Sequence, residues 1–317
     1  MEGSLNMRGI DNDFAKSFKN SELFKLYNDH KQDLFIGIRN NYINLYHNAA
    51  SVCMVSINKD DKIKCKTAKK YLDSEHKDVD GKTTYKTISD DDITKNYHKI
   101  IDNINKYHSP KEKSAQQKLI YNNNLNSNSN WFCIDMEYVK QRNNSKEKAF
   151  GRFDIIAVSV SKKKPYSVAL IELKYDKDAI GGSSGIIKHA EDYIDFIKED
   201  IFNNYLIDEL ISIGNSLNLL GIENPLIKAE KLDFNKCPEI YIITLHNEDD
   251  KARNCMQRYV LNDVPKCSTV NIEKIHGINI TKKNKKNFTP FFLFSSDDGS
   301  NINNIIEDEL YESRTLI

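Results

Sequence analysis

Acidic residues inside apolar segments are the first candidates for chemistry in this chain of 317 residues. Three consecutive segments each carry one: Glu137 in WFCIDMEY, Asp154 in GRFDIIAVSV and Glu172 in YSVALIELKY. Burying a carboxylate costs free energy unless a cation or hydrogen bonds compensate the charge. The three carboxylates therefore predict one shared cation, and Lys174 follows Glu172 by two positions.

Side-chain alternation along strands would bring these groups together. Glu172 and Lys174 should point to the same face of a strand, because successive side chains alternate. A turn folded symmetrically about Lys163 would place Asp154 opposite Glu172. Their Cβ atoms would then be roughly 4.5–5.5 Å apart, close enough for the carboxylates to share a metal ion. A hairpin loop over residues 139–150 would likewise bring Glu137 near Asp154.

The pattern FDIIAV followed by ALIELKY resembles the PD-(D/E)XK, or restriction-endonuclease-like, nuclease superfamily. In that family an Asp on one strand and an E-x-K on the next form a metal-dependent site. The resemblance covers about residues 110–250, with Phe153 where the family has proline. It implies a mixed central sheet flanked by helices. It also implies hydrolysis of phosphodiester bonds, of DNA more often than RNA, in bacterial or mobile-element defence.

This resemblance implies a role for each residue of the site. Mg²⁺, with Mn²⁺ as an alternative, binds through one or two carboxylates, water and substrate phosphate. Asp154, Glu172 and Glu137 would be the metal ligands. Lys174 would position or deprotonate the attacking water and offset charge on the phosphate. The rival interpretation is a non-catalytic nucleic-acid-binding or assembly module, and intact Asp154, Glu172 and Lys174 favour the enzyme.

Two further candidates lie on a helix predicted to begin near Ser184. His189 and Tyr193 stand four positions apart, on one side of that helix. The pair is similar to the Gln-x-x-x-Tyr that some family members carry there, which implies contact with the scissile phosphate or the water. A histidine that simply packs beside the core is the alternative for His189.

Three other residues near these segments have simpler interpretations. Asp135 precedes Glu137 by two positions and is either a second site carboxylate or part of a solvated edge strand. Glu112 follows Ser109-Pro110 in the pattern of a capping box, which explains it without a catalytic role. Trp131 is expected in the core.

The chain divides, on this interpretation, into residues 1–90 and a nuclease-like core over residues 91–317. In the first region, helical spacing over residues 21–49 predicts one long helix or two abutting helices. SVCMVSI and KIKCKTAKKYL then predict a hairpin, and residues 73–92 a long loop. No catalytic constellation appears here, so we expect this helix-and-hairpin region to serve substrate recognition or oligomerisation.

The core alternates helices and strands, which is typical of the α/β class. After a helix from about Asp90 to Tyr107 and another from 110 to 124, residues 131–138, 153–160 and 166–175 predict adjacent antiparallel strands. The remaining predicted elements are helices over 198–220 and KARNCMQRYVL, and strands at EIYIITLHN and FTPFFLF.

The overall charge is balanced, with 46 Lys and Arg against 46 Asp and Glu. A protein that coats nucleic acid without specificity is therefore disfavoured, but a local basic cleft is not. Basic clusters occur at Lys62–Lys70, Lys140–Lys148, Lys162–Lys164 and Lys282–Lys286, either as solvated loops or along a nucleic-acid backbone.

Other features predict the setting of the protein. No window approaches the roughly 18 apolar residues that span a membrane, and the first residues lack an apolar signal core. The six cysteines show neither CxxC spacing nor nearby histidine pairs. We expect a cytoplasmic protein without a membrane partner, and homo-oligomerisation stays open.

Overall fold

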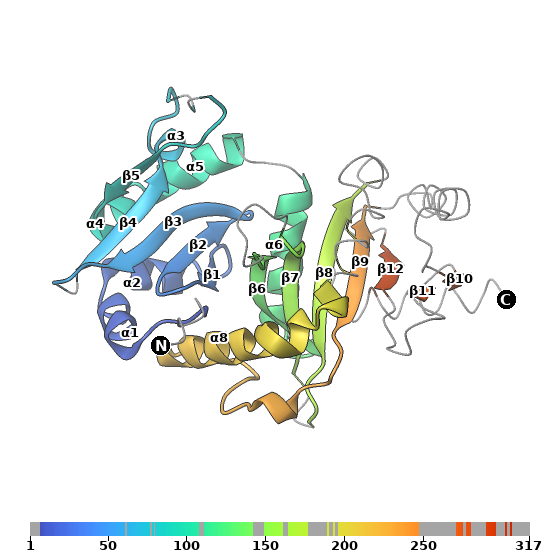
Figure 1. Cartoon of the computed structure of the whole chain (residues 1–317). Coiled ribbons are helices and arrows are strands. Elements are labelled where there is room, and N and C mark those ends of the chain that lie inside the picture. The colour runs from blue at the N-terminus through green and yellow to red at the C-terminus, as the bar shows by residue number, and fades with distance from the viewer. Residues whose placement is uncertain are drawn as a thin grey trace. The chain divides into compact units, whose positions relative to one another are not determined.

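The computed structural model describes residues 7–60, 62–76, 78, 80–107, 111–141, 149–160, 164–176, 189, 193, 196–246, 271–274, 277–279, 290–295, 302 and 305. The fold is mixed α/β, with two sheets flanked by helices (Figure 1). It forms two compact units, one of Met1–Gln117 with Glu209–Ala229 and one of Lys118–Asp208 with Glu230–Ile317. The expected boundary at residue 90 falls inside the first unit.

The first unit contains a five-stranded antiparallel sheet in the order β1-β2-β3-β4-β5. The predicted hairpin of SVCMVSI and KIKCKTA is confirmed as β3 and β4, which pair from Met54–Lys66 to Ile57–Ile63. The strands are β1 Phe35–Ile38, β2 Ile43–His47, β3 Ala50–Ile57, β4 Ile63–Ala68 and β5 Tyr85–Ile88.

Two predictions for this unit are wrong. The helix expected over residues 21–49 ends at Asp29, and the β1–β2 hairpin occupies the second half. The turn contains Asn41 with φ of 54°, a left-handed conformation that asparagine tolerates and a helix excludes. The loop expected over residues 73–92 contains β5, whose four residues were too few for alternation to be recognised.

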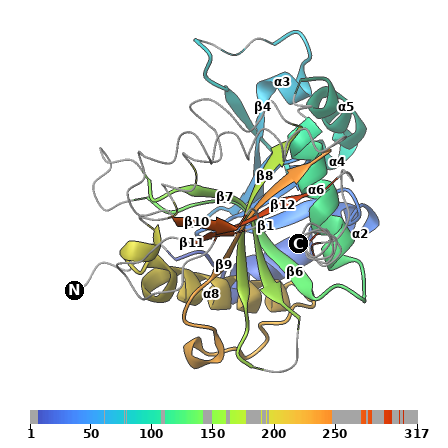
Figure 2. The same ribbon diagram turned by 90° about the vertical axis from the view of Figure 1, so that its right-hand side faces the viewer.

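Helices cover the sheet of the first unit: α1 Asn12–Lys19, α2 Glu22–Asp29, α3 Lys69–Leu72, α4 Asp90–Lys95 and α5 Tyr97–Tyr107. Ser21 caps α2 by accepting a hydrogen bond from the Phe24 N–H, as its type predicts. The helix expected from Asp90 is confirmed, with a break at Asn96. Figure 2 shows α4 and α5 on one side of β4, and Ile93, Ile100 and Ile104 of these helices are buried.

The second unit contains a seven-stranded sheet in the order β10-β11-β12-β9-β8-β7-β6. The three predicted central strands are confirmed as antiparallel neighbours, whereas β8–β9 and β9–β12 are parallel. The strands are β6 Trp131–Val139, β7 Arg152–Ser159, β8 Val168–Tyr175, β9 Glu239–Leu245, β10 Asn271–Lys274, β11 Gly277–Asn279 and β12 Pro290–Phe294.

The remaining described helices are α6 Lys111–Asn124, the π-helix Phe202–Leu206, α8 Ile207–Leu219 and the 3₁₀ turn Lys231–Asp233. They confirm the helices expected to end near Asn124 and to cover 198–220. The helix expected at KARNCMQRYVL and the glycine-rich start of the helix near Ser184 lie outside the described residues. Among the described helices, none is long and apolar enough to cross a membrane.

Candidate active site

Asp154 and Glu172 face each other across the β7–β8 hairpin. Ile155 pairs with Ile171, so the same register places Asp154 opposite Glu172, as the symmetric turn predicts. Each residue is only 3% exposed. Oδ2 of Asp154 accepts a 2.8 Å hydrogen bond from the backbone N–H of Leu173. This bond fixes the Asp154 carboxylate against the strand that carries Glu172.

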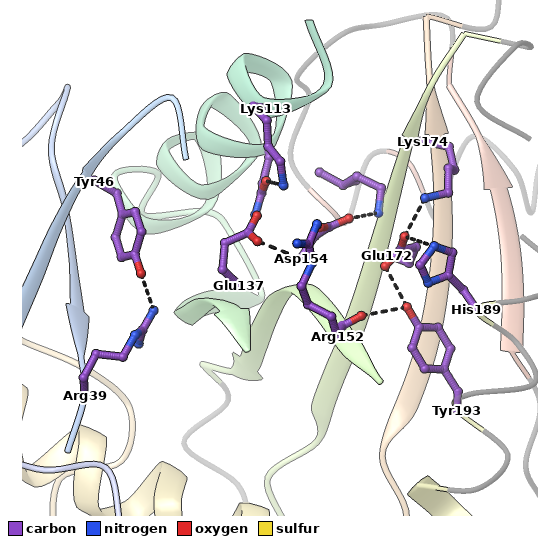
Figure 3. Close-up of polar contacts among 12 residues, drawn as sticks. Arg39, Tyr46, Lys113, Glu137, Arg152, Asp154, Glu172, Lys174, His189 and Tyr193 are labelled. Carbon is purple, nitrogen blue, oxygen red and sulfur yellow. Dashed lines mark hydrogen bonds and ion pairs between the residues drawn. The ribbon is translucent and has the colours of Figure 1, made fainter. Parts of the chain in front are cut away.

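Three side chains surround the carboxylate of Glu172 (Figure 3). Nζ of Lys174 donates to Oε1 over 2.5 Å, as expected for residues two positions apart on one strand face. Nε2 of His189 lies 3.1 Å from the same oxygen, and the Tyr193 hydroxyl donates to Oε2 over 2.7 Å. Both oxygens of Glu172 are therefore held by side chains from the strand and the following helix.

The environment of Glu172 favours its neutral form despite these donors. Burial raises the pKa of Glu172 to about 7, and the nearby charge of Asp154 acts in the same direction. Lys174 and the Tyr193 hydroxyl oppose this rise by stabilising the ionised form. The positive charge near Asp154 and Glu172 is therefore too small to keep both carboxylates ionised. A bound cation would supply the missing positive charge.

His189 and Tyr193 both reach the site, and both do so through Glu172. The Tyr193 ring stacks on Phe153 with centroids 4.6 Å apart, and its hydroxyl also lies 3.2 Å from the Arg152 carbonyl. Tyr193 is fully buried, whereas His189 is partly exposed. His189 therefore does more than pack beside the core, because its ring contacts the carboxylate of Glu172.

Arg152 is a site residue that the sequence interpretation missed. Its Nε lies 3.5 Å from Oε2 of Glu137, and its NH2 group lies 4.0 Å from Oδ1 of Asp154. In Figure 3 the guanidinium lies between these carboxylates. The signal was available: Arg152 precedes Asp154 by two positions, so alternation places both on one face of β7. Glu137 is brought near Asp154 as expected, with Arg152 between them.

Asp135 is fully buried, so its interpretation as part of a solvated edge is wrong. A bulge follows Cys133, after which Asp135 pairs with Ile156 and lies on the side of the sheet that carries Asp154. β6 is the edge strand of the sheet, but most of its residues are buried. Trp131 is buried as expected and contacts Tyr241 edge to face.

Thr244 is a second residue that the sequence did not indicate. It pairs with Lys174 across the parallel strands β8 and β9, so both side chains lie on one face. Its hydroxyl is buried and has no hydrogen-bond partner within the described part of the chain. A threonine in an apolar strand carries no spacing signal, so only the strand register places it beside Lys174.

The residues present suit a hard divalent cation. Asp154 and Glu172 offer carboxylate oxygens on facing strands, the ligand type and number that Mg²⁺ uses together with water and phosphate. Within the described ranges, no three His, Cys, Asp or Glu side chains are already grouped closely enough to hold a metal ion. Glu137 as a third ligand therefore stays a prediction, because Arg152 lies between it and Asp154.

No protein-family model, curated protein sequence or solved structure matches this chain.

Proposed function

We propose that this protein is a metal-dependent nuclease of the PD-(D/E)XK type that hydrolyses phosphodiester bonds, with DNA as the favoured substrate. One observation carries the proposal. Buried Asp154 and Glu172 face each other on neighbouring strands, and Lys174 lies within 2.5 Å of Glu172 on the same face. An ion pair that only stabilised a sheet would not require a second buried carboxylate opposite the first.

Asp154 and Glu172 would hold Mg²⁺ or Mn²⁺ in this mechanism. The bound ion would polarise a phosphoryl oxygen and lower the pKa of an attacking water. Hydrolysis forms a bond from the water oxygen to phosphorus and breaks the bond to one ester oxygen, which takes up a proton. His189 and Tyr193 orient the Glu172 carboxylate through their contacts with its two oxygens.

Lys174 and Arg152 supply positive charge at this centre. The Lys174 ammonium is 5% exposed and beside Glu172, where it can hold the attacking water and offset charge developing on phosphate. The Arg152 side chain is half exposed, and its Nη2 lies 4.0 Å from Oδ1 of Asp154. A guanidinium there can bind a phosphate oxygen when a metal ion compensates the carboxylates.

A cleavage assay on linear, circular and single-stranded DNA and on RNA, each with Mg²⁺ or Mn²⁺, tests the proposal. We expect divalent-metal-dependent cleavage by the wild type and its loss in Asp154→Asn. Asp102→Asn, on the exposed surface of α5, is the matched control and should cleave like the wild type. If the wild type cleaves none of these substrates with either metal ion, and neither ion changes its melting temperature, the nuclease is rejected in favour of a binding module.

A further inference from the structure

A row of lysines lies on the exposed face of β4 in the first unit. Lys62, Lys64 and Lys66 occupy alternate positions and are all exposed. Lys64 and Lys66 lie in β4 and point to the same side of the sheet, because side chains alternate along a strand, and Lys62 directly precedes the strand. Cys65 and Thr67 point to the other side and are buried, with 0% and 1% exposure. The lysines therefore occupy the face that the protein core does not cover.

The neighbours of these lysines on the sheet are uncharged. Lys64 pairs with Ser56, and Lys66 pairs with both Met54 and Thr87. The Lys66 ammonium also lies 4.9 Å from the ring centroid of Tyr85, which is 43% exposed. We call this surface, made of Lys62, Lys64, Lys66, Tyr85 and Thr87, the β4 lysine face.

Within the described residues, no carboxylate forms an ion pair with the lysines of the β4 lysine face. Strands β3, β4 and β5 contain no Asp or Glu. No ion pair of the described residues involves Lys62, Lys64 or Lys66. The nearest described acidic residue along the chain is Asp60, in the β3–β4 turn. An acid-free face is notable in a chain with equal numbers of basic and acidic residues.

Two ordinary functions of exposed lysines do not account for this arrangement. Keeping an exposed face in water needs charge but not a single sign of charge. Lysines also block unpaired sheet edges, but β4 is paired on both sides and β5 is the edge strand. The spacing fits a polyanion: alternate residues of a strand are about 6.6–6.8 Å apart, close to the axial rise of two nucleotides of one DNA strand, at about 3.4 Å each along the helix axis.

We propose that the β4 lysine face binds the phosphate backbone of the nucleic-acid substrate. This inference rests on the proposed function, because it takes a nucleic acid as the substrate. It assigns the first unit a substrate-binding role with named residues. The contact is independent of base sequence, since lysines that reach phosphates read charge and not base edges.

Binding of a labelled 30-base-pair DNA duplex, measured by fluorescence anisotropy in EDTA between about 50 and 200 mM salt, tests the inference. Three lysines of the face are replaced together in Lys62→Ala/Lys64→Ala/Lys66→Ala. The matched control, Lys16→Ala/Lys31→Ala/Lys99→Ala, removes the same charge from exposed positions of the same unit. Single-stranded DNA, RNA and anionic phosphatidylserine vesicles are parallel arms, and melting temperatures verify folding.

The β4 variant should bind nucleic acid at least about tenfold more weakly, and its log–log salt slope should fall by about 2–3, near 0.9 for each lost phosphate contact. The control variant should keep most of the wild-type slope. Equal losses in the two variants, or no binding of the wild type to any nucleic acid, would overturn the inference. Binding to vesicles alone would assign the face to a membrane and overturn it too.

Hydrolysis of bis(p-nitrophenyl) phosphate with Mn²⁺ separates this inference from the proposed nuclease. This small substrate has a single phosphodiester and no run of phosphates for a row of lysines to bind, so the wild type and the β4 variant should hydrolyse it equally. If the wild type hydrolyses this substrate but the β4 variant binds nucleic acid as tightly as the wild type, the role of the lysine face is rejected and the nuclease is kept. If the β4 variant binds nucleic acid more weakly but the wild type hydrolyses nothing, the nuclease is rejected and the role of the lysine face is kept.

Discussion

The hydroxyl of Tyr193 donates a 2.7 Å hydrogen bond to Oε2 of Glu172, linking the helix after β8 to the centre of the site. The tyrosine ring is stacked on Phe153 and fully buried, so the hydroxyl has little freedom to leave the carboxylate. Because this bond favours the ionised carboxylate, it lowers the pKa of Glu172 against the opposite effect of burial.

Tyr193→Phe removes this bond and keeps the stacked ring. The pKa of Glu172 should then rise further, so the acid limb of the pH–rate profile should move to higher pH. Activity should fall more at pH near 6 than near 8, and stability should fall by about 1 kcal/mol. Tyr27→Phe, in the first unit, should leave the profile unchanged. An equal loss of activity at all pH values would contradict this account.

Glu172→Gln tests the charge balance through stability in the absence of metal. The pKa of Glu172 is about 7 in the folded protein against 4.5 for an ordinary glutamate. The folded state therefore prefers the protonated form. This stabilising contribution is complete below about pH 4.5 and is lost as pH rises through about 7. The loss is roughly 3–4 kcal/mol, since each unit of pKa difference corresponds to about 1.36 kcal/mol.

The difference in melting temperature between Glu172→Gln and the wild type should therefore increase in favour of the variant from pH 5 to pH 8. Adding Mg²⁺ at pH 8 should stabilise the wild type and reduce the difference. Thermal unfolding followed by circular dichroism at several pH values provides the measurement. Glu223→Gln, at an exposed position, is the matched control and should track the wild type. A constant difference at every pH would disprove the explanation.

The position of Asp154 opposite Glu172 could be predicted, because it depends only on the register of one hairpin and on side-chain alternation. The sequence predicts a short hairpin symmetric about position 163, which gives the register, and alternation then gives the face. The same rule applies to Arg152, two positions before Asp154, but the sequence interpretation considered only the acidic residues of these strands and Lys174. Thr244 comes from a strand about 70 residues further along the chain, and no local rule pairs it with Lys174.

The β1–β2 hairpin could not be distinguished from a helix by spacing alone. Leu34, Ile38 and Leu45 recur at helical intervals, yet all three are buried in or beside a sheet. β1 is buried along its whole length, so it lacks the alternation that identifies a half-exposed strand. Asn40-Asn41 is a turn signal inside this stretch, but the sequence interpretation used only the helical spacing of the apolar residues.

Arg152→Ala tests whether the guanidinium competes with a cation at the carboxylates. Arg152 lies 3.5 Å from Glu137 and 4.0 Å from Asp154, where its charge opposes a second cation. Its removal should tighten Mn²⁺ binding severalfold, a modest effect because the side chain is half exposed and solvent screens it. Isothermal titration calorimetry without nucleic acid measures the affinity. Arg152→Lys should stay near the wild type, and weaker Mn²⁺ binding by Arg152→Ala would refute the competition.

Lys174→Ala distinguishes catalysis from structure most directly. In the proposed nuclease Lys174 acts on the attacking water and on charge that develops during the reaction, whereas metal affinity comes from Asp154 and Glu172. The variant should lose about 10²–10³ in turnover, the typical effect of one positioned electrostatic group, while Mn²⁺ and DNA affinities stay within a few fold. Single-turnover cleavage measured beside calorimetry separates the two effects, with Lys198→Ala as the exposed control. Unchanged turnover, or a loss explained by weaker metal binding alone, would remove Lys174 from the chemistry.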